Sequence, residues 1–145
     1  MRTEIAVLDS TLQKTIAWLN DLSEELGWQD RQKAYSALRV ALHALRDRLG
    51  VNEAVDLGSQ FPILIAGLYY HGWSVNDKPL KLHRQDFLDR IRDAFPNDPD
   101  LDAERVAKAV FRILEDRITA GEIQDVKATL PKDLQQLWAD AVGHA

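Results

Sequence analysis

Residues 34–73 read AYSALRVALHALRDRLGVNEAVDLGSQFPILIAGLYYHGW, and this stretch decides the fold. In its first half, leucines recur at i, i+4, i+7 and i+11, the spacing of one helix face: Leu38, Leu42, Leu45 and Leu49. Gly50 then predicts the end of that helix, with glycine in the left-handed conformation. Residues 61–70 contain no charge, and Pro62 suits a first helical turn because its missing N–H would have no helical partner there. We therefore predict two helices, the second of them surrounded by protein on nearly every side.

Outward from this stretch, the same helical period recurs along the chain. It predicts a first helix over residues 11–26, with Asp9 or Ser10 as its cap, and a short helix over residues 51–57. Residues 74–79 are polar, end in proline and indicate a linker. Further helices are predicted over residues 82–95, 103–118 and 132–142, with a short acidic element between the last two. The fold class expected is therefore all-α.

The two halves of the chain are similar at a fixed offset of 69 residues. Residues 45–49, LRDRL, align with residues 114–118, LEDRI, and Pro62 aligns with Pro131. We predict one domain, residues 1–145, folded as a helical bundle of two tandem four-helix-like repeats related by a pseudo-twofold axis. The first repeat would span residues 11–73 and the second residues 80–143.

Composition excludes several classes of function. The chain of 145 residues has no cysteine, which rules out disulfides and thiolate chemistry. Its net charge of −5 and the absence of a basic arm argue against nucleic-acid binding. No apolar run is long enough to span a bilayer, and the N-terminal sequence lacks a signal-peptide core. A cytoplasmic protein that does not bind membranes is the expectation.

The motifs also resemble a known family. They are LHALRDRL at residues 42–49, QFP at residues 60–62, GLYY at residues 67–70 and GW at residues 72–73. Phe87, Gly121-Glu122 and residues 130–138 fit the same pattern, which is similar to the domain-of-unknown-function 2267 family of bacterial proteins. The resemblance implies a small, all-helical bacterial protein. It brings no catalytic residue, because no activity is established for the family.

The sequence carries no clear signal for catalysis or for a metal. The four histidines, His43, His71, His83 and His144, have neither Glu-x-x-His nor His-x-x-x-His spacing. No serine has an evident base, and there is no glycine-rich phosphate loop. Glu53, Asp56, Glu122 and Asp125 suit a solvated surface, with a divalent ion as the alternative. We predict no catalytic residue, cofactor or metal, and an enzyme is the minority hypothesis.

One set of aromatic and histidine side chains occurs in the first half only. It forms the candidate binding site: His43, Tyr69, Tyr70, His71 and Trp73. Tyrosine and tryptophan combine a large apolar area with a polar tip, which suits a ligand pocket or a protein contact. The alternative is a cluster at the edge of the core whose polar atoms are satisfied internally.

The sequence therefore predicts a non-enzymatic protein-interaction or binding module with an unknown protein partner or small ligand. The alternative is a small-molecule binding or catalytic protein with a pocket at the Tyr69–Trp73 end of the apolar helix. We expect a monomer or a weak homodimer whose contact includes Trp28 or Trp73. We also expect the apolar helix to be the most buried element, contacted by both repeats, so that Leu64→Asp abolishes folding.

Overall fold

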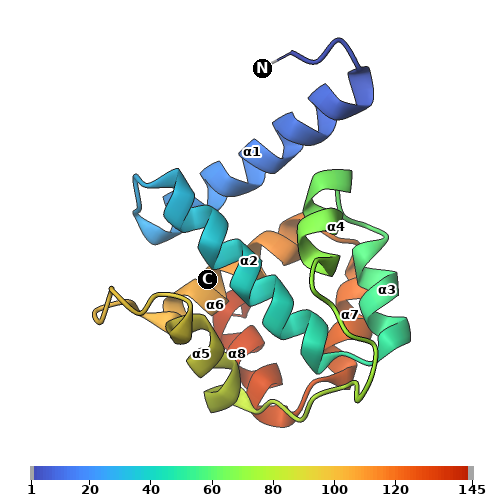
Figure 1. The fold of residues 1–145 in the computed structure, drawn as a ribbon. Coiled ribbons are helices and arrows are strands. Elements are labelled where there is room, and N and C mark those ends of the chain that lie inside the picture. The colour runs from blue at the N-terminus through green and yellow to red at the C-terminus, as the bar shows by residue number, and fades with distance from the viewer. Residues whose placement is uncertain (1, 144–145) are drawn as a thin grey trace.

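The computed structural model describes residues 2–143, which form eight helices and no strand (Figure 1). The helices of the first half are α1 (Ala6–Leu26), α2 (Arg31–Arg48), α3 (Val51–Gly58) and α4 (Ile63–Tyr70). Those of the second half are α5 (Arg84–Asp93), α6 (Ala103–Arg117), α7 (Ala120–Thr129) and α8 (Lys132–Val142). The predicted all-α class is confirmed. None of the helices in residues 2–143 is long and apolar enough to cross a membrane.

The centre of the fold is the pair α2 and α6, which pack against each other and contact most of the other helices. α2 is covered by α1, α4 and α5, and α6 by α1, α5, α7 and α8. The predicted stripe of α2 is buried in full, with Leu38, Leu42, Leu45 and Leu49 at most 1% exposed. In α6, Phe111 stacks on Trp138 of α8, with ring centroids 4.2 Å apart. A single core therefore runs through both halves.

Short polar side chains cap the N-termini of three helices. Asp30 accepts a hydrogen bond from the backbone N–H of Lys33 at the start of α2, and Asp102 does the same for Arg105 in α6. Thr119 caps α7 through the N–H of Glu122. These caps satisfy backbone donors that have no partner inside the helix.

One predicted helix start and one predicted backbone conformation are wrong, whereas α2 ends at Arg48, just before Gly50, as predicted. α1 begins at Ala6, so Asp9 and Ser10 lie inside the helix and neither is its cap. Gly50 has φ −63° and precedes α3 in an extended conformation, whereas Gly27 and Gly72 are the glycines with positive φ. The change of direction after α2 therefore needs no left-handed residue.

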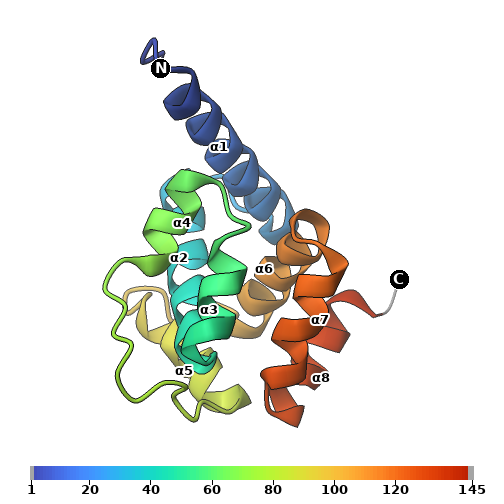
Figure 2. The ribbon, with the colours of Figure 1, turned by 90° about the vertical axis from the view of Figure 1, so that its right-hand side faces the viewer.

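Helix boundaries recur between the two halves. α3 and α7 begin at residues 51 and 120, and α4 and α8 begin at residues 63 and 132, each pair 69 residues apart. The halves also exchange contacts, because α1 packs on α6 while α5 packs on α2. α3 and α7 lie side by side (Figure 2).

The predicted burial of the apolar helix is wrong. α4 packs on α1, α2 and α3, and none of its main contacts is with a helix of the second half. Ile63 is 61% and Leu64 44% exposed, so Leu64→Asp is now expected to leave the fold intact. α8, by contrast, has one buried and one exposed face, since only Leu134, Leu137, Trp138 and Ala141 are buried there. Because residues 61–70 contain no charge, the sequence has no polar face that would indicate which side of α4 is exposed.

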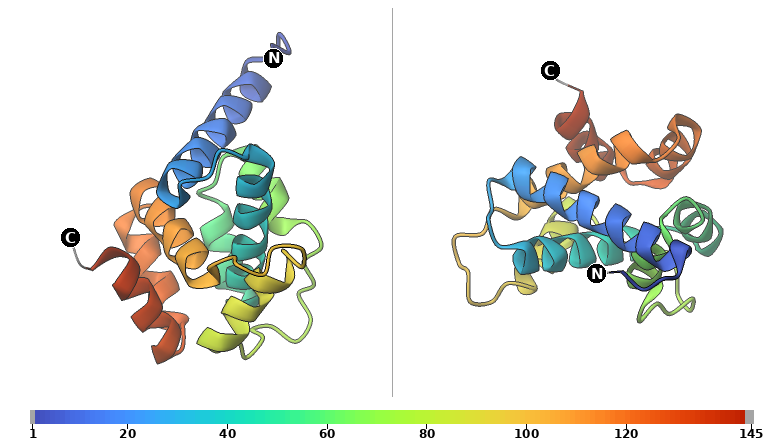
Figure 3. Two further views of the ribbon diagram at one scale, coloured as in Figure 1. Left: turned by 90° about the vertical axis from the view of Figure 1, so that its left-hand side faces the viewer. Right: turned by 90° about the horizontal axis from the view of Figure 1, so that it is seen from above.

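α1 extends beyond the rest of the fold. Its N-terminal part projects away from the other helices in Figures 1 and 2 and in the left-hand view of Figure 3. Residues 4–8 and Ser10 are exposed, whereas Trp18, Leu19, Leu22 and Leu26 are buried. Only the C-terminal part of α1 thus belongs to the core.

Candidate functional site

The aromatic side chains at the end of α4 pack on the C-terminal end of α3. The Tyr69 hydroxyl is buried and donates a hydrogen bond to the carbonyl of Ala54, at 2.8 Å. The Tyr70 hydroxyl donates to the carbonyl of Val55, at 3.3 Å. Burial raises the pKa of Tyr69 well above its usual range, so the hydroxyl remains a donor. Trp73 lies beside Tyr70, with ring centroids 5.5 Å apart.

Two side chains of α2 hold the C-terminal carbonyls of α4, which have no partner within the helix. A ring nitrogen of His43, Nε2, lies 2.7 Å from the carbonyl oxygen of Leu68. Since a carbonyl only accepts, Nε2 carries the proton and donates it. Burial, and then the cations of α2, lower the pKa of His43 despite this bond, which favours the neutral ring. Arg46 donates to the carbonyls of Tyr69 and His71, at 2.8 and 2.9 Å.

Arg46 is itself part of a buried ion-pair network. Its Nε donates to Asp47 at 2.9 Å, and the second oxygen of Asp47 accepts from Arg90 of α5 at 2.8 Å. Arg46 is 4% and Asp47 6% exposed. Burial alone would raise the pKa of Asp47, but the two arginines outweigh that effect and hold the pKa below its usual range. The network joins α4, α2 and α5.

The structure therefore brings four of the five candidate residues together. His43, Tyr69 and Tyr70 each hydrogen-bond the backbone of α3 or α4, and Trp73 packs on Tyr70. The side chain of His71 is exposed. The indole N–H of Trp73 is buried and has no acceptor among the described residues. Apart from that group, the cluster closes the end of α4, and ligand binding there stays a prediction.

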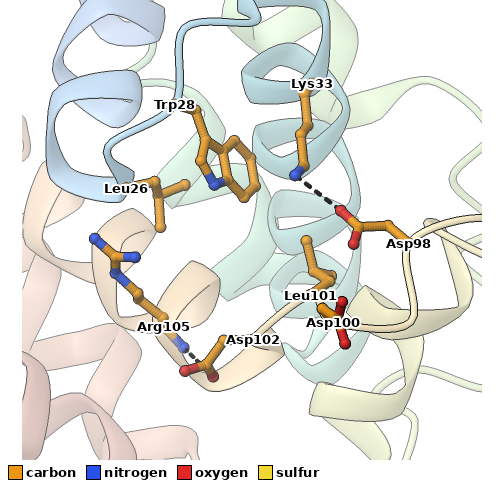
Figure 4. A pocket seen from close by; sticks show the side chains of 8 residues that line it. All are labelled: Leu26, Trp28, Lys33, Asp98, Asp100, Leu101, Asp102 and Arg105. Carbon is orange, nitrogen blue, oxygen red and sulfur yellow. Dashed lines mark hydrogen bonds and ion pairs between the residues drawn. The ribbon is translucent and has the colours of Figure 1, made fainter.

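A surface pocket lies where the α1–α2 turn meets the loop before α6 (Figure 4). Its volume is about 270 Å³, and Leu26, Trp28 and Leu101 form its apolar part. The Lys33 ammonium lies 4.2 Å from the centre of the Trp28 ring and 2.8 Å from Asp98. The protein's own lysine therefore occupies the cation site that the ring and the carboxylate create.

The acidic side chains singled out in the sequence gather where α3 packs on α7. Burial, and then the carboxylate of Asp56, raise the pKa of Glu122. Within residues 2–143, no group of three or more histidine and acidic side chains is placed to hold a metal ion. His144 lies outside the described residues.

A fourth feature is an exposed apolar surface beside the N-terminal part of α1, which we call the α1–α4 patch. It consists of five large side chains that are 43 to 61% exposed: Ile5, Val7, Leu8, Ile63 and Leu64. The hydroxyl of Thr11 accepts the backbone N–H of Leu64 at 2.9 Å, which fixes α4 next to α1. Sequence reasoning missed this surface because it began the first helix at Thr11. A helical pattern traced back to Ile5 would have revealed it.

These features define a class of protein: an all-helical domain with one continuous core, an internally bonded aromatic cluster and an exposed apolar patch. Residues 15–137 match the family model described as "Uncharacterized conserved protein (DUF2267)", and the chain belongs to that family. The predicted resemblance is thus confirmed. No curated protein matches the chain.

Proposed function

We propose that this protein is a non-enzymatic protein-interaction module and that the α1–α4 patch is its contact surface. The observation that carries the proposal is the exposure of five large apolar side chains on the N-terminal part of α1 and the adjoining start of α4. Single exposed apolar residues are ordinary, whereas a contiguous group usually marks an interaction site. Leu64 and Thr11 are hydrogen-bonded to each other, so the parts of the patch contributed by α1 and α4 adjoin.

The polar chemistry of the molecule supports a binding role over catalysis. The side chains of His43, Tyr69 and Tyr70 donate their hydrogen bonds to backbone carbonyls. Asp47 is paired with two arginines. A general base or nucleophile needs a free atom within reach of a substrate. The alternative, a small-molecule site at the Tyr69–Trp73 end, has one observation in its favour, the buried indole N–H of Trp73 without an acceptor.

We also propose that the fold consists of two helical repeats related by a pseudo-twofold axis. Three helix starts or ends recur at the offset of 69 residues, and the contacts of α1 with α6 mirror those of α5 with α2. α2 with α6 and α3 with α7 are then the pairs that a pseudo-twofold axis would relate. In this arrangement the projecting part of α1 is an addition to the first repeat alone.

The proposal is tested by affinity capture from the native host with variants of the patch. Leu8→Glu and Leu64→Glu place charges on side chains that are about half exposed, so both variants should fold. Val75→Glu is the matched control, because Val75 is 54% exposed in the loop after α4. We expect the partners retained by the unmodified chain and by the control to be lost from both patch variants. Partners retained equally by all four proteins would contradict the proposal.

A further inference from the structure

A pair of hydrogen bonds ties the two halves of the chain together at the start of α7. The side-chain carbonyl of Gln60, in the turn between α3 and α4, accepts the backbone N–H of Thr119 at 3.0 Å. The Gln60 amide nitrogen donates to the Thr119 hydroxyl oxygen at 3.1 Å. Thr119 is the N-cap of α7, and the same oxygen accepts the backbone N–H of Glu122 at 3.4 Å. Gln60 therefore holds a helix start that belongs to the other half.

The sequence of this helix start provides a second acceptor for the same N–H. Residues 119–122 read TAGE, which is the Ser/Thr-x-x-Glu pattern of a capping box. In that motif the glutamate side chain accepts the backbone N–H of the cap residue. Here Gln60 occupies that N–H, and the Glu122 oxygen Oε2 is buried without a hydrogen-bond partner among the described residues. Gln60 and Glu122 are thus alternative acceptors for one donor, the N–H of Thr119.

The surroundings of Glu122 oppose its negative charge. Burial raises the pKa of its carboxyl, and three carboxylates from α7 and from α3, which lies beside it in Figure 2, add to this effect: Asp56, Asp125 and Glu53. No lysine, arginine or histidine within residues 2–143, from α6 and α8 included, offsets them. Lys127 of α7 lies 3.4 Å from Glu115 of α6, with which it is paired. The ionised Glu122 side chain therefore gains from any arrangement that gives it a donor.

We propose that Gln60 and Glu122 compete for the Thr119 N–H, which makes this contact a latch between the halves that protonation of Glu122 closes. With Glu122 neutral, Gln60 holds Thr119. With Glu122 ionised, its carboxylate takes the N–H, because a charged acceptor forms the stronger hydrogen bond and a helix N-terminus favours negative charge. Gln60 is then released, and the contact between α3 and α7 loosens. Since the closed form raises the pKa of Glu122, its stabilisation is full below the pKa of the unfolded chain and is lost as the pH rises through the folded pKa.

The first test is nuclear magnetic resonance of the full chain in acid, at about pH 4.5, and at neutral pH. We expect a nuclear Overhauser effect between the Gln60 side-chain amide and the Thr119 methyl group in acid, and its loss at neutral pH. Glu122→Ala removes the competing acceptor and should keep the effect at both pH values. Glu24→Ala removes an exposed carboxylate of α1 and should behave like the original chain. A contact of equal strength at both pH values in the original chain, or one lost from Glu122→Ala at neutral pH, overturns the inference.

The second test measures what Gln60 contributes to stability at each pH. Gln60 is exposed, so Gln60→Ala should fold, and we expect it to lower the urea midpoint in acid but not at neutral pH, where the latch is open. In the Glu122→Ala background, Gln60→Ala should lower the midpoint equally at both pH values. An equal loss at both pH values in the original chain would show that Gln60 holds Thr119 whatever the charge of Glu122, and overturns the inference. No loss at either pH overturns it as well.

Discussion

Arg46 and Asp47 are consecutive residues at the end of α2, and together they join three helices. Arg46 holds two carbonyls at the end of α4, and Asp47 binds both Arg46 and Arg90. The sequence shows Arg46 and Asp47 only as adjacent charged residues near the end of a predicted helix. It could not place either inside the protein, because the carbonyls that Arg46 meets lie 23 and 25 residues further along the chain.

The first prediction concerns Asp47→Asn, which keeps the shape of the side chain but removes its charge. Arg46 is then left buried without its counter-ion, and we expect the free energy of unfolding at pH 7 to fall by about 3 kcal/mol. Asp116→Asn, at the equivalent position of the second half, is the control because Asp116 is exposed. It should change stability by less than about 0.5 kcal/mol. Urea denaturation of the three proteins measures both effects.

The effect of Asp47→Asn on the free energy of unfolding should depend on pH in a defined direction. The folded pKa of Asp47 is lowered, so its carboxylate stabilises the fold above the pKa of the unfolded chain. That stabilisation is lost as the pH falls through the folded pKa. The difference in the free energy of unfolding between the original chain and Asp47→Asn should therefore be largest at neutral pH and should decrease in acid. A gap that does not change with pH would mean that shape, and not charge, accounts for the loss.

Among the elements, the existence of most helices follows from the sequence, whereas their surroundings do not. The starts of α3 and α8 were predicted to the residue, because glycine or proline precedes them and the apolar period restarts there. The burial of α4 was mispredicted, because its eight residues pack mainly on helices of the first half and leave Ile63 and Leu64 exposed. Likewise, no local pattern states that Tyr69 and Tyr70 will reach back to α3, since the two partners are 15 residues distant.

The second prediction concerns the contact of α3 with α4 and compares two glycines. A Cβ on Gly58 would lie 2.1 Å from the Tyr70 hydroxyl oxygen and 3.0 Å from the Tyr69 ring, so Gly58→Ala must displace Tyr70. We expect a loss of about 1–3 kcal/mol in the free energy of unfolding. Gly67 lies within α4, and a Cβ there meets nothing within 4 Å. Gly67→Ala should stabilise the protein by about 0.5–1 kcal/mol.

A double-mutant cycle identifies the cause. If the clash with Tyr70 is responsible, Gly58→Ala should cost much less when Tyr70 is already alanine. An equal cost in both backgrounds would assign the effect to Tyr69 or to the backbone of α3.

At the scale of the whole molecule, the two halves depend on each other. α1 is buried against α6 and α5 against α2, so each half contributes a helix to the core of the other. Polar contacts also cross between the halves: Gln60 binds the backbone N–H and the hydroxyl of Thr119. Ion pairs also cross: Asp47 with Arg90 joins α2 to α5, and Asp21 with Arg117 and Glu25 with Arg112 join α1 to α6. The offset of 69 residues was visible in the sequence, whereas this exchange of helices was not, because similarity between two segments of sequence does not state how they pack.

The last prediction separates the halves by cutting the loop after α4 between Asn76 and Asp77, which are both exposed. Each fragment alone would expose the apolar faces that the other half covers, and neither retains a complete core. We expect residues 1–76 and 77–145 to show weak helicity in isolation, without a cooperative thermal transition. An equimolar mixture should regain the circular dichroism and a cooperative transition of the intact chain, less stable at low concentration because folding has become bimolecular. A fragment that unfolds cooperatively on its own would show that the two halves are separate domains. A mixture whose spectrum is the sum of its parts would show that the connection between the halves, and not only their packing, is needed for the fold.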